Sequence, residues 1–173
     1  MASTREDDTM SIGIAEHFHW FQEYDLWATD RTLVSIDSIP EARRSSPQAV
    51  RAIQIMAHVQ IARHVWHSRV TGAAYDMPKD WFPSWTTERI RAEAKRLDGA
   101  WSGVVASLAT DGGEREVRYS SSEGRRFVST LHEILTHVFN HSTYHRGQVA
   151  RLVVEAGGTR ADTDAILMTR REL

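Results

Sequence analysis

Apolar residues recur at helical spacing in four long segments of this chain, whereas alternating patterns are short and few. Residues 87–108 show the spacing clearly, because Ile90, Ala94, Leu97 and Trp101 follow one another at intervals of three or four residues. Such intervals place apolar side chains on one face of an α-helix. The same pattern predicts helices over three further ranges, residues 14–38, 48–70 and 130–156. Four long helices with little strand predict an all-α protein, a four-helix bundle.

The segments between these helices carry turn-forming residues and one short strand pattern. Residues 72–86 are rich in Trp, Pro and Asp, and we expect them to form a packed loop that covers one end of the domain. Residues 116–119 alternate, residues 120–124 are typical of a turn, and residues 126–128 alternate again. This pattern predicts a short two-stranded ribbon before the last long helix. The tail, residues 159–173, is long enough for one more short helix.

The composition is that of one ordinary globular domain. The 173 residues are 41% hydrophobic and 25% charged, which is enough apolar material to bury a core. We expect residues 1–10 to form a polar N-terminal tail and residues 11–173 to form a single domain. The 23 acidic and 21 basic residues give a formal net charge of −2. A nucleic-acid partner is therefore not expected, since such proteins carry a large basic surface.

Cysteine is absent, and this limits the chemistry that the chain can perform. Disulfides, thiolate metal sites and a cysteine nucleophile are excluded, so a metal ion must be held by His, Asp or Glu. The first ten residues lack the apolar core of a signal peptide, and no segment reaches the roughly 18 consecutive apolar residues of a membrane span. We therefore expect a cytoplasmic protein without a membrane partner.

Three histidines stand four residues apart in the fourth predicted helix: His137, His141 and His145. Side chains four residues apart stack on one face of a helix. On a projection of about 100° per residue, His141 and His145 lie about 20° to either side of the axis through Ile134 and Leu152. We therefore predict that both imidazoles lie at the centre of the buried face. His137 lies about 60° from that axis, at the margin of the apolar face.

Two neighbouring buried imidazoles need partners, because burying unpaired polar groups is costly. A shared metal ion would satisfy both, and hydrogen bonds within the bundle would also do so; we favour the metal ion. On this interpretation His137 is a neighbour of the ligands or a surface residue, and Gln148, one turn from His145, orients a ligand or the substrate. Arg146 points about 100° away from His145, and we expect it to pair with a carboxylate of another helix or subunit.

A single helix cannot complete the coordination of a metal ion, and the second predicted helix offers the third ligand. Of its three histidines, His58 shares a face with Ile61 and Val65, whereas His64 and His67 point elsewhere. This geometry favours His58. The sequence HEILTH at residues 132–137 does not form a zinc-protease motif, because its two histidines are five residues apart and the motif requires four.

The motifs at these positions resemble those of the DinB/YfiT-like superfamily of bacterial four-helix metalloproteins. The block at residues 137–148, HVFNHSTYHRGQ, is similar to the family motif HxxNHxxHHRGQ, with Tyr144 in place of the first histidine of the HH pair. Residues 24–28 (YDLWA) resemble the first-helix signature, and His58 followed by Trp66 resembles the second-helix ligand region. The resemblance covers nearly the whole chain.

The resemblance implies a bundle with up-down-down-up connectivity that assembles as a homodimer. It also implies a divalent metal ion, such as zinc, nickel or a similar ion, bound by His58, His141 and His145. Some members of the superfamily use low-molecular-weight thiols, either in S-transfer or in a thiol-dependent isomerisation. A thiol cosubstrate is therefore a further expectation for this chain.

Three imidazoles leave at least one coordination position open, as in catalytic zinc sites. We therefore expect a metal-dependent enzyme, a hydrolase or a thiol S-transferase, that activates water or a low-molecular-weight thiol against a small-molecule substrate. In a chain without cysteine the thiol must come from a cosubstrate. Two alternatives stay open: a metal-binding sensor without turnover, and a metal ion that only staples the bundle. The sequence assigns no catalytic residue, because no motif identifies one of its carboxylates as the general base.

Overall fold

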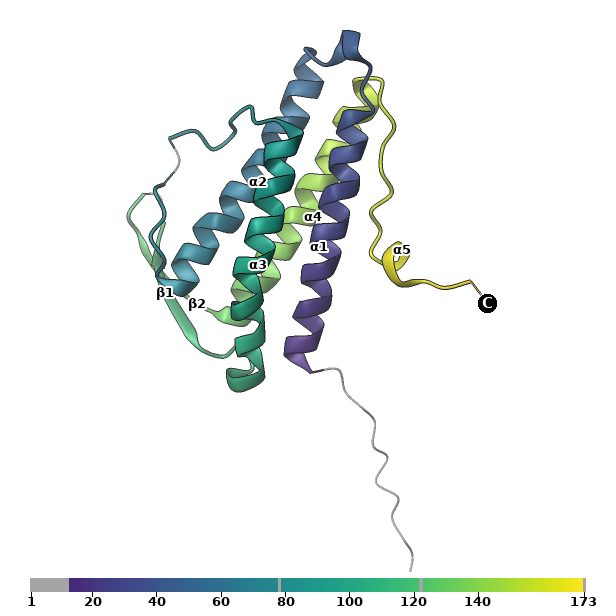
Figure 1. Cartoon of the computed structure of the whole chain (residues 1–173). Coiled ribbons are helices and arrows are strands. Elements are labelled where there is room, and N and C mark those ends of the chain that lie inside the picture. Colours follow the sequence, from purple (N-terminus) through teal and green to yellow (C-terminus); the bar gives the residue numbers. More distant parts are fainter. Residues whose placement is uncertain (1–12, 78, 122, 173) are drawn as a thin grey trace, which may run out of the picture.

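The computed structural model describes residues 13–172 except 78 and 122, and four long helices form its bundle (Figure 1). The helices are α1 (Ile14–Asp37), α2 (Pro47–Thr71), α3 (Thr87–Asp111) and α4 (Leu131–Glu155). The smaller elements are a 3-10 turn η1 (Glu41–Arg43), the strands β1 (Glu116–Ser120) and β2 (Arg126–Thr130), and the short helix α5 (Ile166–Thr169). These elements confirm the predicted all-α four-helix bundle with a ribbon before the last long helix. The expected polar tail, residues 1–10, lies outside the described residues.

Local sequence signals explain where the long helices begin and end. Ser46 caps the amino end of α2, and Pro47 occupies its first position, which needs no amide hydrogen. Gly72 follows the helix with a φ of 73°, a conformation that glycine adopts without strain. At the start of α4, Thr130 and Glu133 form a capping box, in which each side chain accepts a hydrogen bond from the other residue's backbone amide. No helix in the described part of the chain is long and apolar enough to span a membrane.

The four helices run up, down, down and up, as the family resemblance implied (Figure 1). α1 and α2 each pack mainly against α3 and α4, so α1 and α2 occupy opposite corners of the bundle. Because α2 and α3 run in the same direction, the connection between them must return along the whole bundle. Residues 72–86 therefore run lengthwise, and the expectation that they cover one end of the domain is wrong (Figure 1).

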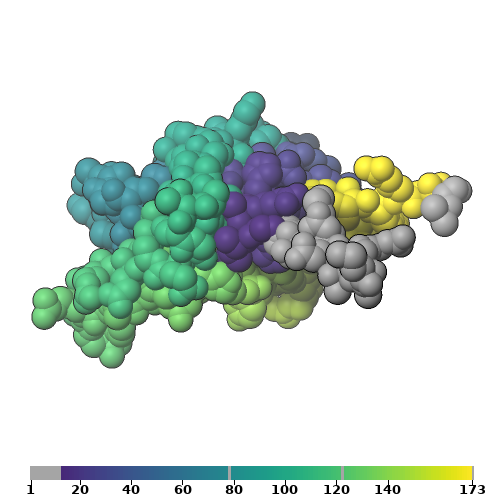
Figure 2. All heavy atoms as spheres, turned by 90° about the horizontal axis from the view of Figure 1, so that it is seen from below, coloured from purple at the N-terminus to yellow at the C-terminus, as the bar shows by residue number. Residues whose placement is uncertain are grey.

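The ribbon projects from the end of the bundle where α3 ends and α4 begins (Figure 1). β1 and β2 pair antiparallel, with Val117 opposite Ser129 and Tyr119 opposite Phe127. Because side chains alternate across a strand, these four residues share one face. Val117 on that face joins the apolar core, so Tyr119 is turned toward the bundle as well. Seen from below, the ribbon protrudes on one side of the bundle and the C-terminal segment on the other (Figure 2).

The apolar core consists of two clusters with a layer of buried polar side chains between them. One cluster joins the C-terminal halves of α1 and α4 to the N-terminal halves of α2 and α3, and the other joins the opposite ends of α1, α3 and α4 to β1. Between the clusters lie polar side chains that are at most 3% exposed, among them Asp25, Thr29, Gln60, Arg63 and Arg146. This polar layer lies at mid-height, at the same level of the bundle as the histidines of α2 and α4.

Candidate metal centre

The structure brings His58 of α2 together with His141 and His145 of α4. One ring nitrogen of each residue lies within 4.8 Å of those of the other two. The centroid of the His58 ring is 5.2 Å from that of His141 and 5.0 Å from that of His145, and the centroids of His141 and His145 are 4.4 Å apart. The three residues that the sequence singled out therefore converge on one point between two packed helices.

Hydrogen bonds hold the ring nitrogens that face away from this cluster. His58 Nδ1 lies 3.1 Å from the carbonyl oxygen of Trp81, and since a carbonyl only accepts, Nδ1 carries the hydrogen. His145 Nδ1 lies 3.0 Å from Gln148 Oε1 and donates in the same way. In both rings the lone pair is therefore on Nε2. Histidines that bind metals are usually oriented by such a donation from the other ring nitrogen.

The donor set fits a small divalent ion. His141 Nε2 and His145 Nε2 are 3.1 Å apart. Two nitrogens that each lie about 2.0–2.1 Å from a tetrahedral zinc ion are about 3.3 Å apart, which is close to the separation in this pair. Imidazole ligands suit zinc, nickel and similar ions, whereas magnesium and calcium prefer oxygen ligands.

Burial and the neighbouring imidazoles keep the cluster uncharged. Desolvation, followed by the proximity of His145, His58 and His137, lowers the pKa of His141 to about 3. Desolvation is also the main cause that lowers the pKa of His58 and the pKa of His145. All three rings are therefore neutral at neutral pH, and the neutral ring is the form that binds a metal ion.

The burial of His141 and His145 differs from the prediction. Both rings are half-buried and lie toward one edge of the buried face of α4, whose centre lies near Val149 and Ser142. The predicted axis passed through Ile134 and Leu152, and these two residues lie at one margin of the buried face. Leu135, Phe139 and Val153 are buried on the opposite side of that face. The edge position leaves the imidazoles accessible from one side, as a site that exchanges small molecules requires.

The neighbouring histidines take other positions. His137 is exposed, and its ring centroid lies 5.5 Å from that of His141 and 5.3 Å from that of Trp66. It adjoins the cluster without being part of it. His64 and His67 face α3, where each lies within hydrogen-bonding distance of an oxygen atom. This agrees with the helix projection, which pointed both residues away from the face of His58.

The loop between α2 and α3 forms one wall of the site, a contribution that the sequence reasoning missed. Phe82 stacks on His58, with ring centroids 4.3 Å apart and planes inclined by 16°. The guanidinium of Arg51 in turn lies 4.2 Å from the centre of the Phe82 ring. The concentration of aromatic residues in this connection was the available signal, but nothing in the sequence indicated which helix they would contact.

A buried ionic network lies on the interior side of α4. Asp25 of α1 accepts a hydrogen bond of 2.5 Å from Arg146 Nη1, and its other carboxylate oxygen lies 3.2 Å from Nη1 of Arg63 in α2. This pairing confirms the prediction that Arg146 meets a carboxylate of another helix. Because Arg146 directly follows His145, the network anchors the segment of α4 that carries two of the three clustered histidines.

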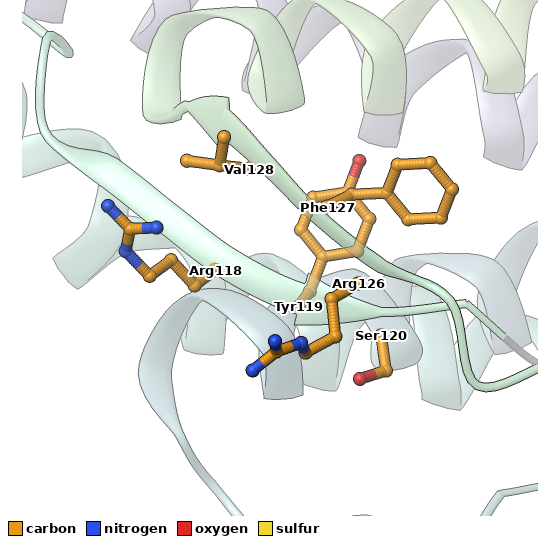
Figure 3. A pocket seen from close by; sticks show the side chains of 6 residues that line it. All are labelled: Arg118, Tyr119, Ser120, Arg126, Phe127 and Val128. Carbon is orange, nitrogen blue, oxygen red and sulfur yellow. The ribbon is translucent and has the colours of Figure 1, made fainter.

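A surface groove of 790 Å³ lies along the ribbon and contains none of the three histidines (Figure 3). Its lining residues are Arg118, Tyr119, Ser120, Arg126, Phe127 and Val128. The rings of Tyr119 and Phe127 lie on one side of the ribbon, while Arg126 and Ser120 extend to the other (Figure 3). The groove has no His, Asp or Glu in its lining, so the three-histidine cluster is the better candidate for a metal centre.

Comparisons with known proteins agree with the sequence motifs. The family model of the DinB family matches residues 14–172. A stretch of 47 residues is 43% identical to the protein named Protein DinB of Bacillus subtilis (strain 168). This stretch is 25% of the present chain and covers 27% of that protein's length. No solved structure matches the chain.

Proposed function

This chain belongs to the DinB family, and from that premise we propose that it is a metal-dependent enzyme whose divalent ion is held by His58, His141 and His145. The orientation of the rings carries the proposal. Nδ1 of His58 and Nδ1 of His145 donate outward, so their Nε2 lone pairs are left for one shared ion, and His141 Nε2 lies 3.1 Å from His145 Nε2. The nitrogen ligands favour zinc, nickel or a similar ion.

The proposed reaction is hydrolysis of, or S-transfer to, a small molecule. Three protein ligands leave at least one coordination position open, and a divalent ion would supply Lewis acidity that lowers the pKa of a water molecule toward about 7 or holds a thiol as its thiolate. The protein's own groups keep the ligands in place: Gln148 and the Trp81 carbonyl hold two of the rings, and Phe82 shields one side of His58 from water. Because the chain has no cysteine, the thiol in S-transfer is a low-molecular-weight cosubstrate.

Elemental analysis of the purified protein and of a His141→Ala variant tests the metal centre. We expect about one ion per chain in the natural protein and none in the variant, because two remaining imidazoles bind weakly. His19→Ala is the matched control, since His19 is exposed on α1 and pairs with Glu23. Stoichiometric metal in His141→Ala would contradict the proposed ligand set.

Chelation distinguishes an enzyme from the two alternatives. An open catalytic position predicts a small decrease in Tm on chelation and a change in the optical spectrum of the cobalt-loaded protein when a thiol is added. An ion that only staples the helices predicts a large decrease in Tm and no spectral response. A sensor predicts a change of oligomeric state on metal loading, without turnover.

The proposal includes a homodimer in the cytoplasm that acts on a small molecule, with no nucleic-acid or membrane partner. The dimer is supported by the family resemblance. Light scattering of the metal-loaded protein measures its mass in solution, and a mass equal to that of one chain would remove the dimer from the proposal without affecting the metal centre.

A further inference from the structure

Two arginines share the face of α2 that carries His58. Arg51 precedes His58 by seven residues and Arg69 follows it by eleven. Both intervals are close to whole helical turns, so the three side chains leave α2 within about 20° of one another. Along the helix axis the two arginines lie about 10 Å and about 16 Å from His58, on opposite sides. The candidate metal centre therefore lies between two guanidinium groups.

Arg51 reaches the site through the loop. Its guanidinium lies 4.2 Å from the centre of the Phe82 ring, and Phe82 stacks on His58. Asp80 is the acidic residue nearest in sequence to Phe82, and it accepts a hydrogen bond from the Phe82 amide. Among the described residues no carboxylate lies within 4.0 Å of the Arg51 guanidinium, so its charge is not neutralised by an ion pair.

Arg69 is held on the other side by an aromatic pair. Its guanidinium lies 4.7 Å from the Trp66 ring centre and 5.2 Å from that of Tyr119 on the ribbon, and it donates a hydrogen bond of 3.0 Å to the Ser120 carbonyl. Trp66 contacts His137, which adjoins the cluster. No described carboxylate forms an ion pair with Arg69 either, although the group is partly desolvated.

Two other carboxylates near the site, those of Asp25 and Glu93, already form ion pairs with other arginines. Asp25, the buried carboxylate behind the site, is shared by Arg63 and Arg146. Glu93 of α3 pairs with Arg96 and lies against His64, on the far side of α2 from His58. Apart from Asp80, which accepts the Phe82 amide hydrogen, the charged side chains described here against the aromatic residues beside the cluster are those of Arg51 and Arg69.

We propose that the ligand of this site is a small anion, such as a carboxylate-bearing thiol or ester, whose carboxylate pairs with Arg51 on one side of the cluster or with Arg69 on the other, while its reactive end meets the three-histidine centre. The inference rests on the proposed metal centre and adds the substrate class to it. A guanidinium binds a carboxylate through paired, charge-assisted hydrogen bonds. Stacking on Phe82, Trp66 and Tyr119 holds both guanidiniums in place before the ligand arrives, which reduces the entropy lost on binding.

Two thiols of nearly the same size and different charge test the proposal. We would titrate cobalt-loaded protein with 3-mercaptopropionate and with 3-mercapto-1-propanol and measure thiolate binding from the near-ultraviolet charge-transfer band. We expect the anionic thiol to bind at least about tenfold more tightly. This preference should shrink when NaCl is raised from about 20 mM to about 200 mM, since salt screens exposed charges.

The variants separate charge from structure. R51Q/R69Q should lower the preference to about one while leaving the affinity for the neutral thiol within about twofold, and R51K/R69K should retain part of it. R31Q/R89Q is the matched control. Arg31 lies over Trp27 and donates to a backbone carbonyl, and Arg89 lies over Trp85. Neither the Trp27 ring nor the Trp85 ring is among the described rings that stack on the three histidines. This control should keep the full preference.

The outcomes also separate this inference from the proposed function. A charge-transfer band with both thiols and no preference for the anion, or a preference unchanged in R51Q/R69Q, would overturn the anionic ligand and leave the metal centre standing. Failure to bind cobalt, or the absence of a band with either thiol, would overturn both.

Discussion

His145 and Arg146 are adjacent in sequence, yet they belong to two regions of opposite character. The histidine cluster is neutral, half-buried and open on one side, and its outer nitrogens are held by an amide oxygen and a carbonyl. The ionic network around Asp25 is charged and enclosed, and its members pair with one another. A rotation of about 100° per residue separates the two on one helix. Neighbouring residues of α4 can therefore serve two faces: a binding face, which carries His141 and His145, and an anchoring face, which carries Arg146.

The two regions should also differ in what they contribute to stability. Removing one member of a buried ion pair leaves an uncompensated charge, which costs far more than losing an exposed polar contact. In the network two arginines share one carboxylate, so removing the Asp25 side chain leaves two buried cations without a counter-ion. The three histidines carry no charge at neutral pH, so substituting one of them leaves no unpaired charge in the protein.

The largest expected effect is on folding. Asp25→Ala should lower the free energy of unfolding of the metal-free protein by about 3–5 kcal/mol, because it leaves Arg63 and Arg146 buried without a counter-ion. His141→Ala should change the same quantity by less than about 1 kcal/mol, because its ring lies at the edge of the core. Urea denaturation followed by circular dichroism measures both.

Asp30→Ala is the control for Asp25→Ala, since Asp30 is exposed and its ion pair with Arg91 is worth at most about 1 kcal/mol. Equal losses in Asp25→Ala and His141→Ala would end the distinction between an anchoring face and a binding face.

A smaller effect is expected on metal affinity. Gln148→Ala should weaken binding by about 10- to 100-fold without removing it, because the His145 ring would lose the acceptor that orients it. Competition with a chromogenic chelator measures the change. Ser107→Ala is the control, because Ser107 also makes a side-chain hydrogen bond, to the Val104 carbonyl on α3, and α3 carries none of the three histidines. An unchanged affinity in Gln148→Ala would mean that packing alone orients the ring.

The last expected effect is on how the stability of the metal-free protein depends on pH. The folded pKa of His141 is lowered to about 3 from the 6.5 expected in the unfolded chain. Between these values the unfolded chain binds a proton at this residue and the folded chain does not, so the stability of the metal-free protein rises with pH across this window and falls as the pH is lowered. His141→Gln should make the slope of unfolding free energy against pH shallower. An identical slope in both proteins would contradict the assigned pKa.

Most of the fold followed from periodicity. The four long helices were predicted within a few residues of their observed bounds, since apolar spacing and the terminal glycines and prolines are local signals. α3 continues to Asp111, a turn beyond the expected end, because the signal that stops it is Gly112 in a left-handed conformation. The course of residues 72–86 was not predictable in this way, because an irregular loop has no period.

The candidate metal centre was predicted only in part, because only the spacing within one helix is a local signal. The spacing of His141 and His145 was visible in one helix, whereas their meeting with His58 depends on how two helices face each other, and the resemblance supplied what the projection only favoured. Asp25 and Arg63 carried no sign of burial, since charged residues normally lie on the solvent face. Only the assembled bundle shows that each has a partner inside.

The position of the polar layer between the two apolar clusters has a consequence for the alignment of the helices. Hydrophobic contacts are non-directional, so they oppose only weakly the sliding of one helix along another. A slip of α4 by one turn, about 5.4 Å, would separate Arg146 from Asp25 and would carry His141 the same distance away from His58. The axial register of the helices that pairs the buried charges is therefore also the register that brings the three imidazoles together. A misaligned bundle would lose the buried ion pairs and would be less stable even in the absence of a metal ion.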